Sequence, residues 1–127
     1  MTVQTWQVLV VEDEQDSMEL IRGLLEHHGI PSVGVRSAED ALKILPDVSP
    51  TLILIDLSLP GKNGWELLKI LQTSETHSKI PRIAITAYHT AELAEYAIQA
   101  GFNAYFAKPI TATTFVRELE AVVQNIN

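Results

Sequence analysis

One stretch of the chain decides how the fold is read: Thr51-Leu52-Ile53-Leu54-Ile55-Asp56-Leu57-Ser58-Leu59-Pro60-Gly61. Residues 52–55 are large and apolar, and the carboxylate of Asp56 follows them directly. A strand with one face in water would alternate apolar and polar residues, so this run predicts a strand buried on both faces, as in parallel sheets covered by helices. Pro60 and Gly61 interrupt strand pairing and predict a turn. We therefore expect Asp56 at the carboxyl end of a central strand, where open α/β sheets bind ligands, although a carboxylate that only caps the turn fits the same pattern.

The rest of the chain alternates between apolar runs typical of strands and amphipathic stretches typical of helices. The further predicted strands cover residues 8–11, 30–35, 80–87 and 103–107. The predicted helices cover residues 17–28, 38–45, 65–71, 90–100 and 115–126. Pro31 cannot donate to a neighbouring strand, which places the segment 30–35 near an edge of the sheet. The alternation predicts a single α/β domain, 1–127, in which a parallel sheet is joined by right-handed crossovers and covered by helices on both faces.

Composition narrows the possible function. The chain has 127 residues, close to the commonest size of a single domain, and a formal net charge of −7 at pH 7. An acidic chain without a basic cluster is a poor partner for nucleic acid, but it favours a divalent cation wherever carboxylates converge. The absence of Cys excludes disulfides, and no apolar run is long enough to span a bilayer. Because the N-terminus also lacks the pattern of a signal peptide, we expect a cytoplasmic protein.

Polar side chains stand at the ends of the predicted strands: Glu12-Asp13, Asp56, Thr86 and Lys108. Because parallel strands end at the same edge, we expect these groups to share one crevice. Carboxylate oxygens suit Mg²⁺, or Mn²⁺ in its place, which keeps waters for a phosphate oxygen to replace. Lys108 and Thr86 are able to donate to the same phosphoryl group, and Asp56 is placed to act as its nucleophile. The acidic run after the first strand also fits a solvated turn before a helix, so the local pattern leaves both interpretations open.

In this order and at these strand ends, the residues resemble the receiver domain of response regulators in two-component signalling, over essentially the whole chain. The matching elements are Glu12-Asp13, Asp56 after an apolar strand, Pro60-Gly61-Lys62-Asn63-Gly64, Thr86-Ala87, Tyr105 and Lys108-Pro109. The resemblance implies a flavodoxin-like, doubly wound sheet of five parallel strands in the order 2-1-3-4-5, with five helices. It also implies phosphorelay signal transduction by a stand-alone receiver, because no output domain follows the last predicted helix.

The resemblance further implies the chemistry of the site. A histidine kinase or a histidine phosphotransfer protein would donate a phosphoryl group to Asp56. Glu12 and Asp13 would hold Mg²⁺ together with Asp56. The main-chain carbonyl of Ser58 would be a further ligand. The protein would thus carry a 4-aspartylphosphate and act as a self-phosphorylating and autodephosphorylating receiver, not as a turnover enzyme.

A conformational switch is implied by the same resemblance. Thr86 and Tyr105 would form the switch pair. Thr86 and Ala87 would lie against the phosphoryl group, and Lys108 would contact it. The Lys108-Pro109 bond would be cis. Phosphorylation would change the surface formed by the fourth helix, the last strand and the fifth helix, and a downstream protein would dock there. No direct contact with nucleic acid or membrane is expected.

Three other interpretations fit these patterns less well. An aspartyl-phosphate-forming phosphatase or phosphotransferase on a related α/β fold commonly needs a second Asp two residues after the nucleophile, and Ser58 stands there. A flavin or nucleotide carrier cradles phosphate after the first strand with Gly, Ser and Thr, whereas the acidic run of this chain would repel it. A degenerate receiver that serves only for docking is disfavoured by the intact set of strand-end residues.

Overall fold

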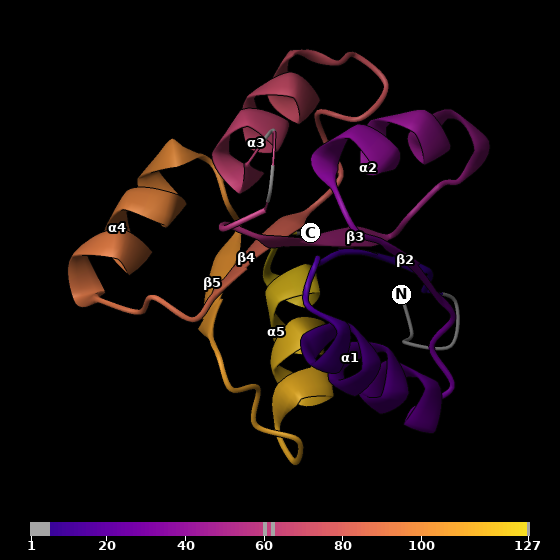
Figure 1. Cartoon of the computed structure of the whole chain (residues 1–127), viewed down its shortest axis with the longest axis vertical. Helices are drawn as coiled ribbons and strands as arrows, with labels where there is room; N and C mark the ends of the chain where they lie inside the picture. The colour runs from indigo at the N-terminus through magenta and orange to yellow at the C-terminus, as the bar shows by residue number, and fades with distance from the viewer. Residues whose placement is uncertain (1–5, 60, 62, 127) are drawn as a thin grey trace.

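The computed structural model describes residues 6–59, 61 and 63–126, and over these residues the chain forms one parallel sheet flanked by helices (Figure 1). The strands are β1 (Val8–Val11), β2 (Ser32–Val35), β3 (Leu52–Asp56), β4 (Arg82–Thr86) and β5 (Ala104–Ala107). The helices are α1 (Gln15–His27), α2 (Ala38–Ile44), the short 3-10 helix η2 (Leu45–Asp47), α3 (Gly64–Thr73), α4 (Ala91–Ala100) and α5 (Phe115–Ile126). The strand order is β2-β1-β3-β4-β5, and each of these pairings is parallel. The predicted fold class and strand order are confirmed. None of the helices in the described part of the chain is long and apolar enough to cross a membrane.

Helices cover both faces of the sheet: α1 and α5 pack on one face, and α2, α3 and α4 on the other (Figure 1). Successive residues of a strand point to opposite faces, so a strand covered on both sides is apolar at every position. In β3, Leu52 and Leu54 belong to the core beside α1 and α5. Ile53 and Ile55 belong to the core beside α2, α3 and α4. Each of the four is at most 1% exposed, and burial of such a side chain stabilises the fold by roughly 1.5–3 kcal/mol.

The two outer strands are less buried than the central ones. All residues of β2 and β5 are half-buried, whereas every residue of β1 and β3 is buried. The predicted edge position of the segment around Pro31 is confirmed: Pro31 lies just before β2, and its carbonyl accepts a hydrogen bond from Val8 N–H at 3.0 Å. The strand itself starts later than predicted, because Ile30 N–H donates to Leu25 O at 2.9 Å and so belongs to the turn that ends α1.

Two further boundaries differ from the predicted ones for local reasons. Helix α1 starts at Gln15, earlier than the predicted residue 17, because its first turn is polar and the apolar stripe begins only at Met18. Strand β4 starts at Arg82, later than the predicted residue 80, because Ile80 N–H donates to His77 O at 3.2 Å within the preceding turn. The remaining elements agree with their predicted bounds to within two residues.

Candidate functional site

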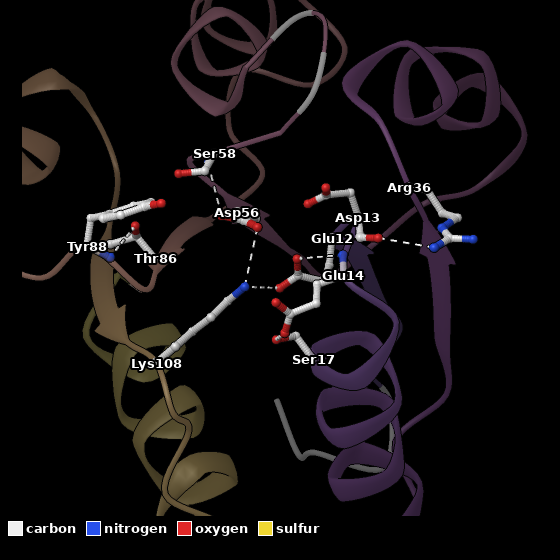
Figure 2. Close-up of polar contacts among 10 residues, drawn as sticks. All are labelled: Glu12, Asp13, Glu14, Ser17, Arg36, Asp56, Ser58, Thr86, Tyr88 and Lys108. Atoms are coloured by element: carbon white, nitrogen blue, oxygen red, sulfur yellow. Dashed lines mark hydrogen bonds and ion pairs between the residues drawn. The ribbon is translucent and has the colours of Figure 1, made fainter.

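The loops that follow β1, β3, β4 and β5 enclose a hollow of about 310 Å³ at the carboxyl edge of the sheet (Figure 2). Its lining residues are Asp13, Glu14, Asp56, Ser58, Ala87, Tyr88 and Lys108. Several of them are the strand-end groups that the sequence predicted to share one crevice. Asp56 lines the hollow and is only 5% exposed, so a molecule that reaches its carboxylate must enter here.

Asp56 is the last residue of β3, and both of its carboxylate oxygens have a donor (Figure 2). Oδ1 accepts a hydrogen bond from Ser58 N–H at 3.0 Å, and Oδ2 lies 3.3 Å from Lys108 Nζ. The first contact is the turn cap that the sequence allowed, and the second joins the end of β3 to the residue after β5. Asp56 therefore caps the turn and also presents its carboxylate to a cationic group. The Lys108–Pro109 peptide bond is cis, the isomer that the resemblance implied.

The loop after Asp56 is fixed where it enters α3. Asn63 Oδ1 accepts from Glu66 N–H at 3.0 Å, and Glu66 Oε1 accepts from Asn63 N–H at 3.2 Å, so the two side chains form a capping box. Gly64 packs directly on the strand: a Cβ atom there would lie 2.6 Å from Asp56 O and 2.9 Å from Leu57 Cα. This close approach explains the need for glycine at position 64. Residues 60 and 62 of the same sequence motif lie outside the described residues.

Glu12, Asp13 and Asp56 form a cluster in which one carboxylate oxygen from each lies within 4.8 Å of the others. Glu12 is 1% exposed; its Oε1 lies 2.5 Å from Lys108 Nζ, and its Oε2 accepts from Glu14 N–H at 3.2 Å. Glu12 and Asp56 thus contact one ammonium, and Asp13 adds a third carboxyl group, so acidic groups outnumber the cation. Carboxylate oxygens gathered at this spacing are the ligand type that Mg²⁺ and Mn²⁺ prefer. The residues present therefore fit a divalent metal ion.

The pKa values of Glu12 and Lys108 are shifted by burial and by neighbouring charge. Burial, with the hydrogen bond to Asp56, raises the pKa of Glu12 from 4.5 to about 7, and the contact with Lys108 only partly opposes this. Burial alone would lower the pKa of Lys108, but the hydrogen bond to Glu12 and the charge of Asp56 outweigh it, so the pKa of Lys108 is raised. Lys108 thus stays cationic at neutral pH, whereas Glu12 titrates near it.

The Glu12 shift gives a prediction for the metal-free protein. Because the folded-state pKa of Glu12 lies above the unfolded value, the folded state binds the extra proton. The contribution of Glu12 to stability is therefore fully present below about pH 4.5 and is lost as the pH rises through about 7. We expect the free energy of unfolding, measured with urea in EDTA, to be lower at about pH 8 than at about pH 6 by about 1 kcal/mol because of this group. Glu12→Gln should remove that loss, and Glu14→Gln, at an exposed position, should retain it. Equal pH dependence in wild type and Glu12→Gln would contradict the shift.

The two predicted switch residues lie in different surroundings. Thr86 is 1% exposed at the end of β4, and its hydroxyl accepts from Tyr88 N–H at 3.0 Å (Figure 2). Tyr105 lies on the edge strand β5, outside the lining of the hollow, and its hydroxyl is 3.3 Å from His89 Nδ1. Because Tyr88 and His89 are consecutive residues, the loop between β4 and α4 connects the two predicted switch residues.

Sequence reasoning did not identify Arg36 as part of the site. Its guanidinium extends from the end of β2 and donates from Nη2 to the main-chain carbonyl of Asp13 at 3.1 Å (Figure 2). Arg36 is exposed, lies outside any apolar pattern and is separated from Asp13 by 23 positions. Only the pairing of β1 with β2 brings the two residues together, so no signal in the sequence could have found the contact.

Comparison with known proteins gives consistent results. The chain matches the family model for the response regulator receiver domain over residues 8–120. It is 36% identical over 117 residues to the polar-differentiation response regulator DivK of Brucella ovis, covering 92% of this chain and 95% of that protein. The receiver domain of a sensor histidine kinase from Pseudomonas aeruginosa, solved with a magnesium ion coordinated in its active-site cleft, is similar with a TM-score of 0.84 and 27% identity over 94% of this chain and 98% of that one. The receiver domain of NtrX from Brucella abortus is similar with a TM-score of 0.83 and 28% identity over 92% of this chain and 98% of that one.

The family match spans all five strands of the described sheet. The strand order that the resemblance implied is the order observed. The acidic cluster lies at the edge of the sheet where such folds bind their ligands. The chain belongs to the response regulator receiver domain family, and its function is phosphorelay signal transduction.

Proposed function

We propose that Asp56 is the phosphoryl acceptor of this receiver domain. The observation that carries the proposal is the position of its carboxylate, which lines the hollow and contacts Lys108 from a strand end 52 positions away. A further part of the proposal is that Asp56 shares a Mg²⁺ or Mn²⁺ ion with Glu12 and Asp13, and that the carbonyl of Ser58 completes the protein ligands. The close spacing of the three carboxylates and the magnesium ion in the Pseudomonas receiver domain support this.

Phosphoryl transfer to Asp56 is a displacement at phosphorus. An oxygen of the Asp56 carboxylate attacks the phosphorus in line with the bond to the donor. A new P–O bond forms as the P–N bond of a phosphohistidine, or the P–O bond of acetyl phosphate, breaks. The electron pair leaves with the imidazole, which takes a proton from solvent, or with acetate. A divalent cation, when bound, offsets the negative charge that the phosphoryl oxygens bring toward the carboxylates.

Three residues are proposed to contact the phosphoryl group once Asp56 carries it. The ammonium of Lys108 is able to turn from Glu12 toward a phosphoryl oxygen, with which it would form a charge-assisted hydrogen bond. The hydroxyl of Thr86 now accepts from a main-chain N–H of its own loop, and it would donate to the phosphoryl group after rotation. Ala87 lines the hollow beside Thr86 and is the proposed main-chain contact.

Incubation of the protein with acetyl phosphate tests the proposal. With Mg²⁺ we expect the intact mass to rise by one phosphoryl group, and hydroxylamine should reverse this because an acyl phosphate is a mixed anhydride. With EDTA the mass should stay unchanged. Sustained release of phosphate from a simple monoester would instead support the phosphatase alternative, which membership of a signalling family does not favour.

We also propose the partners. The phosphoryl donor would be a histidine kinase or a histidine phosphotransfer protein, the donors that a receiver domain implies in general. A downstream protein would dock on the face formed by α4, β5 and α5. Support for this face comes from Ile98 of α4, which is 48% exposed, and from the contact of Tyr105 on β5 with His89 just before α4.

Beryllofluoride, a non-covalent mimic of the phosphoryl group, tests the switch. In Mg²⁺ we expect large amide shifts at Thr86, Tyr88 and Tyr105, because a Thr86 hydroxyl that turns to the ligand releases Tyr88 N–H and moves the loop that contacts Tyr105. NMR spectra of Thr86→Ser should retain the Tyr105 shift, and those of Thr86→Ala should lose it. A full Tyr105 response in Thr86→Ala would show that the signal takes another route.

A further inference from the structure

We propose that Arg36 is a positioning residue of the metal site: it fixes the main chain of Asp13 and thereby the direction of the Asp13 carboxylate. The inference rests on the proposed metal site at Glu12, Asp13 and Asp56. Arg36 itself is not a ligand, because its guanidinium is a cation that would repel a metal ion. Its contribution is geometric, through a hydrogen bond to the residue that carries the ligand.

The end of β2 contacts both residues of the acidic pair through the main chain. Val35 O accepts from Glu12 N–H at 3.0 Å, which continues the pairing of β1 with β2 by one residue. The strand pairing ends at this point, and the next contact is made by a side chain. Arg36 Nη2 donates a hydrogen bond to Asp13 O at 3.1 Å. The chain between β1 and α1 is therefore attached to the end of β2 at two peptide units, Val11–Glu12 and Asp13–Glu14.

The attachment affects the carboxylate because Asp13 is the member of the cluster with the least support. Glu12 is buried and contacts Lys108, and Asp56 is held at the end of β3 by Ser58 N–H. Asp13 is only half-buried (Figure 2 shows its carboxylate pointing toward Asp56 and its carbonyl toward Arg36). The carbonyl that Arg36 contacts and the side chain that carries the carboxylate belong to the same residue, so the hydrogen bond restrains the main chain from which the carboxylate extends. Ligands held in place by such indirect contacts bind metals more tightly.

Charge and geometry make opposite predictions for the loss of Arg36, so the sign of the effect decides between them. Removal of a cation near an acidic cluster would by itself strengthen the binding of Mg²⁺. Loss of the bond to Asp13 O would weaken it. We expect the dissociation constant of Mg²⁺ to rise about three- to tenfold in Arg36→Ala, measured by calorimetry and by electron paramagnetic resonance with Mn²⁺ as the probe.

Arg22→Ala is the matched control. Arg22 is also exposed and also donates from Nη2 to a main-chain carbonyl of β2, Ser32 O, at 3.1 Å, but at the other end of the strand. The variant removes the same charge and the same type of bond, and its metal affinity should stay within about twofold of wild type. Equal effects of both substitutions, or unchanged or tighter binding in Arg36→Ala, would overturn the inference.

A double-mutant cycle shows whether Arg36 acts through Asp13. In the Asp13→Asn background, Arg36→Ala should change the affinity for Mn²⁺ by less than about twofold, because the carboxylate that Arg36 positions is absent. A full effect of Arg36→Ala in that background would overturn the inference. Wild-type protein that binds neither Mg²⁺ nor Mn²⁺ would refute the proposed metal site, an outcome distinct from normal wild-type binding that Arg36→Ala leaves unchanged.

Discussion

Replacement of Asp56 by Asn is expected to lower the rate of phosphoryl uptake from acetyl phosphate by roughly 10³-fold or more. The amide is neutral and a poor nucleophile, so the new P–O bond cannot form at this residue. The substitution also removes one of three clustered carboxylates and should weaken the binding of Mg²⁺. Intact-mass spectrometry after incubation with Mg²⁺ and acetyl phosphate measures both the extent and the rate of uptake.

Two controls make the Asp56→Asn result specific. Asp47→Asn makes the same chemical change at an exposed position after α2, outside the lining of the hollow, and should leave uptake unchanged. Circular dichroism should show that Asp56→Asn is folded. Any residual label on Ser58 would resist hydroxylamine, since a phosphate ester is not an acyl phosphate. Hydroxylamine-sensitive uptake by Asp56→Asn at the wild-type rate would show that another carboxylate is the acceptor.

Gly64→Ala is expected to destabilise the protein by roughly 2–3 kcal/mol. The added Cβ would lie 2.6 Å from Asp56 O and 2.9 Å from Leu57 Cα. Both are backbone atoms at the end of β3, so the clash cannot be relieved by rotation of a side chain. Either the start of α3 moves outward or the end of β3 shifts, and the second outcome displaces the Asp56 carboxylate. A decrease in phosphoryl uptake should therefore accompany the loss of stability.

Urea unfolding of Gly64→Ala beside Gly23→Ala checks this expectation. Gly23 lies within α1, is exposed, and would have no atom within 4 Å of an added Cβ. Alanine should stabilise that helix by up to about 1 kcal/mol, so the same substitution should have opposite signs at the two positions. A Gly64→Ala protein as stable as wild type would mean that the contact between α3 and β3 is looser than the structure indicates.

The fold was predictable because a strand that is buried on both faces of a sheet has a continuous run of apolar residues. Residues 52–55 cannot alternate in polarity when neighbours on either side of the sheet are helices, and the run could be read without knowledge of any distant residue. The start of a helix was harder to predict where its first turn is polar, as at Gln15. The N-terminal turn of α1 is specified by polar residues that also occur in loops, so an apolar pattern could not detect it.

The contents of the site were predictable in kind but not in geometry. Parallel strands end at one edge, so the sequence alone predicts that Glu12, Asp13, Asp56 and Lys108 lie together. Which oxygen meets which donor depends on the lengths of the loops and the register of the strands. The two contacts of the Asp56 carboxylate follow from those details: Oδ1 accepts from Ser58 N–H, and Oδ2 lies near Lys108 Nζ.

The sequence by itself determined the order and type of the elements and the acidic edge of the sheet, because residue type and local spacing encode which segments are buried and where strands end. The tertiary structure alone decided the raised pKa of Glu12, the contact of Tyr105 with His89 and the hydrogen bond from Arg36 to Asp13 O. Each of these depends on groups brought within a few ångströms by strand pairing across 16 to 96 positions of the chain. Hydrogen bonds and desolvation act only over such distances, and no local pattern records them.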